Sequence, residues 1–269
     1  ILKKNPDAKL LSGGTDLSLE VTKSRKELKK IISLNSIKEL DFINNKKNEI
    51  EIGAGTSLIE FEKLIKKHYP DFNSILKRYG SVQIRNVGTI AGNIATASPI
   101  GDTLPLLLSL DAKIILDGAK SRELISLNEF FISYRKTRLK KGQFIYSVKI
   151  PIYKKNIFKA YKISKRFDDD ISSVCGSFNI EIDKNRIKKI KIAYGGMSEI
   201  PKRAKNTEKT LINSIFSEKI FVKAIKNLES DYRPIDDMRA SKSYRMEIAK
   251  NLLLKCFLEV KNKKTLRVN

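Results

Sequence analysis

The sequence contains few of the residues from which metal centres and covalent catalytic sites are built. Its 269 residues include two cysteines and one histidine. Two thiolates cannot hold a [2Fe–2S] cluster, which needs four ligands, and one histidine excludes a histidine-based metal site or catalytic triad within the chain. Cys175 and Cys256 stand far apart in apolar segments, so we expect two buried thiols. We expect His68, in KKHYP, to lie on the surface at the end of a helix.

Long hydrophobic runs are also absent. The most apolar segment, LPLLLSL, is followed at once by Asp111, whereas a membrane-spanning helix needs about 20 apolar residues. No signal peptide is visible, so we expect a cytoplasmic protein without a membrane association. Because the sequence begins at Ile1 and not at methionine, we expect it to be part of a longer protein.

Acidic residues are scarce beside basic ones. The chain has 54 lysines and arginines against 30 aspartates and glutamates, which gives a formal net charge of +24. Nucleic-acid binding is one interpretation, because clustered cations neutralise phosphates. The lysines are spread over the whole chain, however, in segments such as KSRKELKK, LIKK and RIKKIK, without a basic helix or interleaved aromatic residues. This pattern favours a solvated surface whose positive potential would attract anionic ligands and an acidic partner.

Glycine is concentrated in a segment that runs from Arg78 to Pro105, RYGSVQIRNVGTIAGNIATASPIGDTLP. Its glycines permit positive φ values or a close approach to another group, and short hydroxyl and amide side chains lie between them. Inward-turned N–H groups in such a segment form an anion-binding nest, and Asp102 can cap the apolar helix expected to follow. The segment therefore predicts a nucleotide-binding loop, with an ordinary glycine-rich connection as the alternative.

A second segment, KLLSGGTDL from Lys9 to Leu17, strengthens the prediction of a nucleotide site. An apolar strand leads into Gly13 and Gly14 and then into a Thr-Asp pair. This order is typical of a diphosphate-binding loop, because backbone donors must reach the pyrophosphate without side chains between them. The spacing fits neither GxGxxG nor GxxxxGK[ST], so a Rossmann or P-loop site is excluded.

Together these two segments resemble the FAD-binding domain of the molybdenum hydroxylases, the family of xanthine dehydrogenase, carbon monoxide dehydrogenase and aldehyde oxidase. Three later motifs agree with the resemblance: YRKT at residues 134–137, KRFDDDI at residues 165–171 and YGGM at residues 194–197. The acidic segment followed by YGGM is more similar to the xanthine dehydrogenase branch than to the carbon monoxide branch. The resemblance covers nearly the whole chain.

The resemblance implies an α+β fold in two domains. Residues 1–152 are expected to form a two-part FAD-binding domain of the vanillyl-alcohol-oxidase type, with two α/β subdomains. Residues 157–263 are expected to form a smaller C-terminal domain, a three-stranded antiparallel sheet with helices, beyond a boundary at YKKN (153–156). The residue patterns predict strands at 9–11, 30–34, 49–54, 112–116, 123–126, 144–150, 158–164, 174–182 and 187–194, and helices at 37–41, 58–68, 72–79, 104–110, 207–212, 218–229 and 241–261.

The resemblance also implies which residues contact FAD. Gly13, Gly14 and Thr15 are expected closest to the pyrophosphate, in a form of the loop common in bacterial members. Tyr79 and Tyr146 stand where the animal xanthine dehydrogenases have Phe and Leu. The predicted cofactor-binding residues are Leu10, Leu11, Ser12, Gly13, Gly14, Thr15, Asp16, Leu17, Tyr79, Thr89, Ile90, Ala91, Gly92, Asn93, Asp102, Tyr146 and Lys162.

The acidic run from Asp168 to Asp170 has two interpretations. Three adjacent acids in a basic protein often form a solvated loop. The resemblance instead places this loop beside the flavin ring, with Asp169 as a modulator of the electric field there. No side chain is expected to act as nucleophile or general base, since the flavin carries the chemistry, and no metal ion is expected in this chain.

The function implied by the resemblance is that of an FAD-dependent oxidoreductase component in purine catabolism. Electrons would pass from [2Fe–2S] clusters through FAD to NAD, while a purine is hydroxylated at a molybdenum cofactor. The clusters and the molybdenum cofactor would lie on other domains or subunits. Three alternatives stay open: an aldehyde, carbon monoxide or an aromatic acyl-CoA as substrate, oxygen as the acceptor, and, less favoured, a basic nucleic-acid-binding module.

Overall fold

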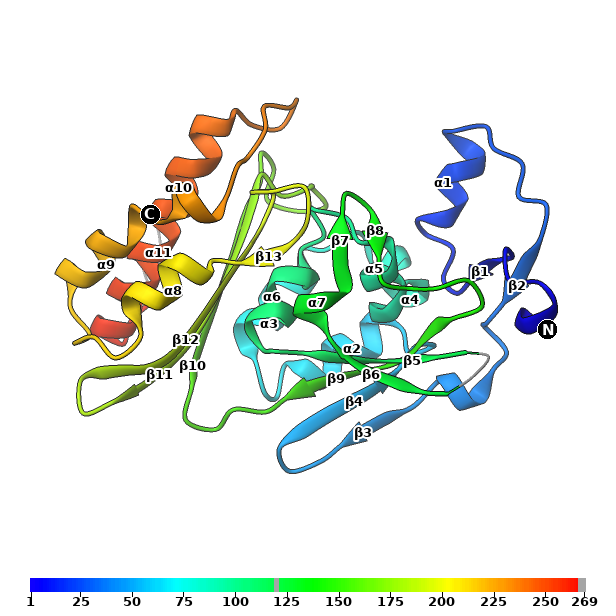
Figure 1. Ribbon diagram of the computed structural model, residues 1–269, viewed down its shortest axis with the longest axis horizontal. Helices are drawn as coiled ribbons and strands as arrows, with labels where there is room; N and C mark the ends of the chain where they lie inside the picture. Colours follow the sequence, from blue (N-terminus) through cyan, green and yellow to red (C-terminus); the bar gives the residue numbers. More distant parts are fainter. Residues whose placement is uncertain (119–120, 266–269) are drawn as a thin grey trace. The chain divides into compact units, whose positions relative to one another are not determined.

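The computed structural model describes residues 1–118 and 121–265 (Figure 1). The chain divides into two compact units. Unit 1 consists of Ile1–Ser98 and Asp111–Ile152, and unit 2 of Pro99–Leu110 and Tyr153–Asn269. The sequence-based division after residue 152 put Pro99–Leu110 in the first domain, whereas in the structure this segment belongs to unit 2.

The core of unit 1 is a five-stranded antiparallel sheet in the order β3-β4-β9-β5-β6. Its strands are β3 (Ile43–Asn45), β4 (Glu49–Gly53), β5 (Lys113–Asp117), β6 (Glu123–Ser126) and β9 (Phe144–Pro151). Ile50 and Ile52 on β4 pair with Ile150 and Val148 on β9, and all four side chains are fully buried. Polar residues alternate with them, so one face of the sheet forms the core. The exposed strand β3 lacks this alternation and was not predicted.

The glycine-rich segment predicted as a loop contains two short helices in the structure. The helices of unit 1 are α1 (Leu17–Thr22), α2 (Leu58–Ile65), α3 (Pro70–Lys77), α4 (Val82–Val87), α5 (Ile90–Thr96) and α7 (Leu127–Phe130), with the 3-10 turns η1 (Leu2–Lys4) and η2 (Lys38–Leu40) and the small hairpin β7 (Phe131–Ser133)–β8 (Lys136–Thr137). Helices α4 and α5 begin at side-chain caps: Ser81 Oγ accepts from Ile84 N, and Thr89 Oγ1 accepts from Gly92 N. The glycines of this segment gave no indication of these two helices, whose sequence signals are the caps Ser81 and Thr89.

The first residues form the least buried part of unit 1. Strands β1 (Lys9–Leu11) and β2 (Ile31–Ser33) pair in parallel, and α1 lies between them in the sequence (blue in Figure 1). Within the described range 1–118, no residue before Leu40 is buried. Segments with few buried contacts open most readily, and the predicted pyrophosphate loop starts in β1.

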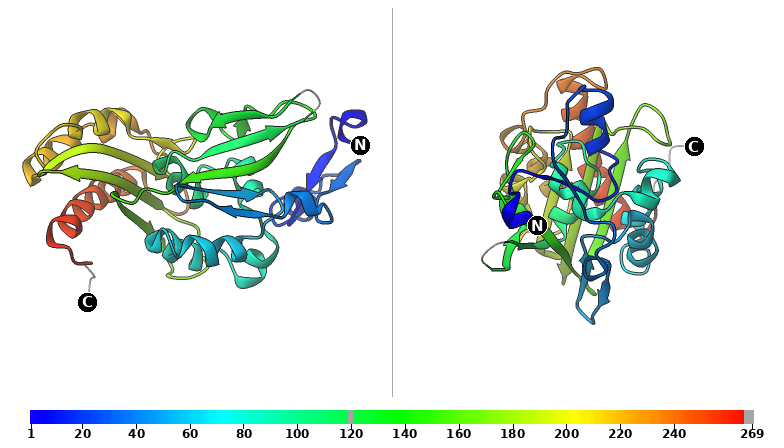
Figure 2. Two further views of the ribbon diagram at one scale, coloured as in Figure 1. Left: turned by 90° about the horizontal axis from the view of Figure 1, so that it is seen from below. Right: turned by 90° about the vertical axis from the view of Figure 1, so that its right-hand side faces the viewer.

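Unit 2 is built on a four-stranded antiparallel sheet, where three strands were predicted. The order is β10-β11-β12-β13, with β10 (Ile157–Ile163), β11 (Val174–Asp183), β12 (Arg186–Gly195) and the two-residue strand β13 (Lys202–Arg203). The helices are α6 (Thr103–Ser109), α8 (Lys205–Leu211), α9 (Glu218–Ile225), α10 (Leu228–Asp231) and α11 (Lys242–Asn262). Both views in Figure 2 show α8 to α11 (yellow to red) beside the strands of this unit.

Strand β11 explains why Pro99–Leu110 belongs to unit 2. Phe178 and Ile180 belong to the apolar cluster that joins the sheet to α8–α11. Residues of the opposite parity contact the inserted segment: Ser177 Oγ lies 2.6 Å from Ser109 Oγ, and Asn179 Nδ2 donates to Ser109 O at 3.1 Å. Because successive side chains of a strand point to opposite faces, β11 is covered on both faces, with α6 on the polar one.

The turn predicted between β11 and β12 is confirmed. Lys184 and Asn185 both have positive φ, 45° and 61°, as a two-residue hairpin turn of type I′ requires.

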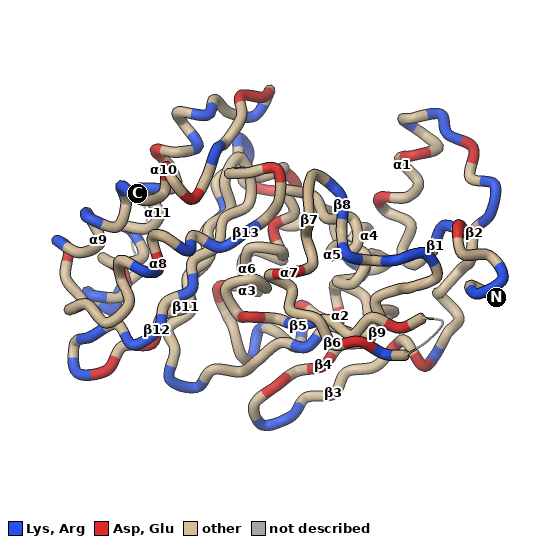
Figure 3. The backbone as a smooth tube through the Cα atoms, in the orientation of Figure 1, with Lys and Arg blue, Asp and Glu red and all other residues tan. Residues whose placement is uncertain are grey.

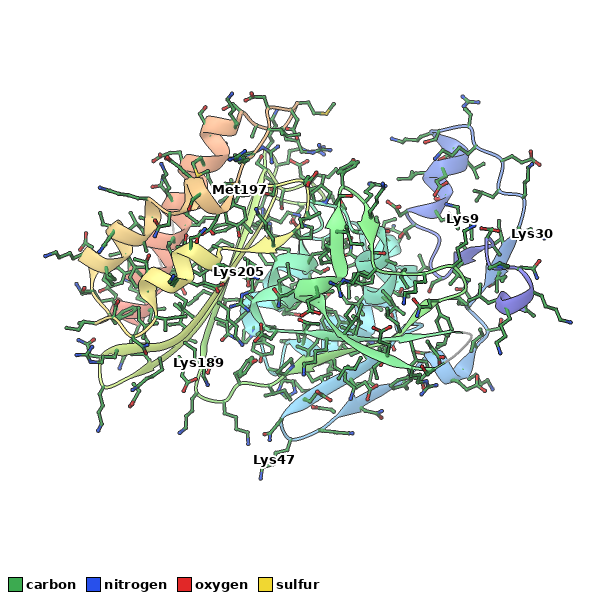
Figure 4. The ribbon with its side chains drawn as sticks, viewed as in Figure 1. Lys9, Lys30, Lys47, Lys189, Met197 and Lys205 are labelled. Carbon is green, nitrogen blue, oxygen red and sulfur yellow. The ribbon has the colours of Figure 1, made fainter. Side chains whose placement is uncertain are left out.

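The basic residues are spread over the whole chain, as the sequence indicated. Figure 3 shows Lys and Arg at intervals along both units, and the lysines labelled in Figure 4, such as Lys47, Lys189 and Lys205, come from separate places in the chain.

Candidate nucleotide-binding site

Two of the predicted cofactor-binding segments lie against each other in unit 1. A Cβ added to Gly13 would overlap the carbonyl group of Val87 and lie 2.8 Å from Gly88 Cα. A Cβ added to Gly88 would lie 3.6 Å from Thr15 Oγ1. The turn after β1 and the turn between α4 and α5 therefore pack backbone against backbone, with no room for a side chain at Gly13. Such a surface suits a diphosphate, which is bound mainly by backbone groups.

The local structure fixes this backbone from both sides. Gly14 adopts a positive φ of 70°, which a glycine takes without strain. Leu58 N donates to Gly88 O at 2.8 Å, and Thr89 forms an isolated bridge with Ser57. The start of α2 thus holds the α4–α5 turn in place. The residues Leu11–Thr15 are half-buried, so the loop is both held and accessible to a ligand.

Tyr79 is joined to the same site. Asn93 Nδ2, on α5, donates to the Tyr79 hydroxyl at 2.7 Å. Three predicted contact segments, the loop after β1, the segment Thr89–Asn93 and Tyr79, which lies between α3 and α4, are therefore connected by direct contacts within unit 1.

Asp102 and Lys162 lie in unit 2, where they bind each other. Lys162 Nζ donates to Asp102 Oδ2 at 2.8 Å, and Ser172 Oγ donates to Oδ1 at 2.5 Å. Asp102 stands at the N-cap position of α6, but its side chain makes no capping hydrogen bond. The prediction that it caps this helix was wrong, because a buried carboxylate is better stabilised by a lysine and a hydroxyl than by one backbone N–H. Both residues are at most 5% exposed.

Tyr146 has different neighbours. It lies on β9, where the Arg122 guanidinium stands 3.6 Å from its ring centroid and the Phe42 ring centroid is 5.7 Å away. Neither neighbour belongs to the predicted contact set. Both neighbours lie outside the two glycine turns.

In the acidic loop, residues 168–170, Asp170 makes the hydrogen bonds to the backbone. Asp170 accepts from Arg166 N at 2.8 Å and from Ile171 N at 2.9 Å. The hydrogen bond from Arg166 N has the largest effect on the pKa of Asp170. Together with the hydrogen bond from Ile171 N, it lowers this pKa below its ordinary value. Asp169 sits at the turn with a positive φ of 48°, and its side chain is exposed. Of the three acids, Asp170 builds the loop and Asp169 stands at its tip.

The two cysteines and the histidine that the sequence singled out lie in buried or half-buried positions. Cys175 and Cys256 are buried free thiols, as predicted. His68 is half-buried just beyond the end of α2, and burial, with a smaller effect of Lys67, lowers its pKa. Over residues 1–118 and 121–265, no group of three or more His, Cys, Asp or Glu side chains could hold a metal ion. In the same ranges no helix has the length and hydropathy needed to cross a membrane.

Comparisons with known proteins identify the family of the chain. Residues 1–153 match the model of the FAD-binding domain in molybdopterin dehydrogenase, and residues 159–260 match that of the carbon monoxide dehydrogenase flavoprotein C-terminal domain. Xanthine dehydrogenase 2 of Arabidopsis thaliana is 33% identical over 86% of this chain, which spans 18% of that protein. The glyceraldehyde dehydrogenase medium chain of Sulfolobus acidocaldarius is 30% identical over 96% of this chain and 92% of its own length.

Solved structures share the fold. Carbon monoxide dehydrogenase from Hydrogenophaga pseudoflava gives a TM-score of 0.87 at 23% identity, covering 92% of this chain and 87% of that one. Quinoline 2-oxidoreductase from Pseudomonas putida 86 gives a TM-score of 0.88 at 20% identity, covering 98% and 93%. The chain belongs to the FAD-binding components of the molybdenum hydroxylase family, in which iron–sulfur and molybdenum cofactors sit on other domains or subunits. The glycine turns fit this assignment, because a diphosphate is bound mainly by backbone groups and the loop Leu11–Thr15 is half-buried.

The close contact at Gly13 predicts the effect of a single methyl group. Gly13→Ala forces Val87 and Gly88 to move, so we expect FAD affinity to fall by about tenfold or more. Gly195→Ala, on β12 of unit 2, is the matched control, since its Cβ would meet Pro99 and Pro105 only at ordinary contact distances of 3.4 Å or more. FAD titration by flavin fluorescence measures both. Equal affinities of the two variants would show that the Gly13 contact does not shape the site.

The buried pair in unit 2 predicts non-additive stability. Lys162→Met leaves the Asp102 carboxylate buried without its cation and is expected to lower the free energy of unfolding by about 3–5 kcal/mol. Asp102→Leu is expected to act similarly on the lysine. The double variant should lose much less than the sum of the two, as urea unfolding of the full chain would measure. Additive losses would contradict a direct interaction.

Proposed function

We propose that this chain is the FAD-binding, electron-transfer component of a xanthine dehydrogenase-type molybdenum hydroxylase. In this proposal it takes electrons from [2Fe–2S] clusters on another domain or subunit and passes them to NAD. The observation that carries the proposal is the contact between the Gly13 turn and the Val87–Gly88 turn, in a chain whose family binds FAD. The xanthine dehydrogenases among its relatives support the branch.

In this proposal the residues of the chain bind and orient the cofactor. The backbone of Ser12–Thr15 and of Gly88–Asn93 holds the diphosphate, and Thr15 and Thr89 stand beside it with hydroxyl groups. FAD, when bound, supplies the electron chemistry. The surrounding lysines and arginines raise the local concentration of anionic nucleotides, since the formal net charge is +24. Asp102, Lys162 and Tyr146 stay predicted contacts, and a cytoplasmic location stays part of the proposal.

A second candidate rests on another relative. The Sulfolobus glyceraldehyde dehydrogenase medium chain is 30% identical over 96% of this chain. This likeness supports the FAD-binding component of an aldehyde-oxidising enzyme as the alternative. The two candidates share the FAD site and differ in the organic substrate, which the molybdenum-containing partner would select.

The test is a visible absorption spectrum of the full chain after incubation with FAD and desalting, followed by anaerobic titration with NADH. Retained flavin bands that NADH bleaches would support FAD binding and NAD as the acceptor. Retained bands that NADH leaves unchanged would exclude NAD as the electron acceptor and favour oxygen. A colourless protein would overturn the proposal and restore the basic, nucleic-acid-binding alternative, which predicts DNA binding with a steep salt dependence.

The position of Asp169 at the loop tip predicts a charge effect on NADH. If its carboxylate faces the nucleotide route, Asp169→Asn removes a repulsion and should lower the KM for NADH about two- to fivefold, the range of exposed charge pairs. Asp168→Asn, also exposed, is the matched control. Stopped-flow reduction of the bound flavin measures both variants. An unchanged KM in Asp169→Asn would instead support the interpretation of residues 168–170 as a solvated loop.

A further inference from the structure

Arg85 is a buried charged residue in unit 1 that sequence reasoning missed. It lies on α4 and is 7% exposed. The cost of burying a guanidinium is large unless it is paired and hydrogen-bonded. Its partners therefore indicate what it does.

These partners are the backbone of one loop and one carboxylate. Nη1 of Arg85 donates to Gly80 O at 2.5 Å and to Tyr79 O at 3.3 Å. Its Nε lies 3.3 Å from Glu62 Oε2, on α2, in an ion pair whose side chains are 9% and 14% exposed. The planar, rigid guanidinium can hold two carbonyls and a carboxylate at once, which a lysine cannot do.

The loop that Arg85 holds is under conformational constraint. Gly80 has a positive φ of 57°, and a Cβ there would lie 3.1 Å from Ile84 Cγ2. The backbone thus turns sharply just after Tyr79. On the other side, the Tyr79 hydroxyl accepts from Asn93. Tyr79 is held at its carbonyl by Arg85 and at its hydroxyl by α5, so its ring has a defined position.

We infer that Arg85, held by Glu62, is a positioning residue that sets the Tyr79 ring for FAD binding. The inference rests on the proposed function. Arg85 acts through the backbone of Tyr79–Gly80, and the buried Glu62 carboxylate orients the guanidinium and balances its charge. FAD affinity therefore depends on Arg85 through Tyr79.

The test is a double-mutant cycle on FAD affinity. Arg85→Gln removes the donor fork, and FAD binding should weaken about 10- to 100-fold, the range for lost charge-assisted hydrogen bonds. In a Tyr79→Ala background the same substitution should have little further effect. Arg85→Lys should give an intermediate loss. Lys77→Gln, an exposed position nearby that also loses one positive charge, controls for long-range attraction and should be unchanged.

Two further measurements separate positioning from general stability. Phe130→Leu, in α7, perturbs the core of unit 1 at another helix. If this variant and Arg85→Gln have the same apoprotein Tm but only Arg85→Gln loses FAD affinity, positioning is supported. Equal losses of affinity, or additive effects of Arg85→Gln and Tyr79→Ala, would overturn the inference. A wild-type chain that binds no FAD would instead refute the proposed function.

Discussion

The close approach of Gly13 to the Val87–Gly88 backbone is the constraint on which the candidate site depends. It brings together a turn near the start of the chain and a turn more than seventy residues later. Neither turn could approach the other if Gly13 carried a side chain. Two features hold the second turn in place: the Thr89 cap fixes the start of α5, and α2 holds Gly88. Arg85 and Asn93 hold the neighbouring Tyr79.

The two units differ in how their residues are buried. In unit 1 the Gly13 turn lies within residues 1–39, where no residue is buried, so a ligand that binds there adds stability to this part. Unit 2 buries β11 on both faces and takes α6 from the first half of the chain to do so. The buried Asp102–Lys162–Ser172 group fixes the start of that inserted helix. Stability in unit 2 thus comes from packing and paired charges, and the adaptable surface lies in unit 1.

Much of this arrangement could be predicted from the sequence, and the failures have physical reasons. Alternating apolar residues located β4, β9 and β11, and Asp183–Arg186 indicated the hairpin turn between β11 and β12. Helices α4 and α5 were missed because glycine was given more weight than the Ser81 and Thr89 caps. The pairing of Asp102 with Lys162, 60 positions apart, is set by tertiary packing and leaves no local pattern. Arg85 left a weak signal, a lone charge in the apolar segment VQIRNV, but its partners could not be read from spacing.

The central claim is that the turns around Gly13 and Gly88 together form the FAD diphosphate site. Amide hydrogen exchange of the full chain, with and without FAD, tests this claim most directly, because exchange reports local opening along the backbone. The account predicts that FAD slows exchange most strongly at residues 9–17 and 88–93, two segments distant in sequence. FAD that binds but protects other segments and leaves these two unchanged would contradict it.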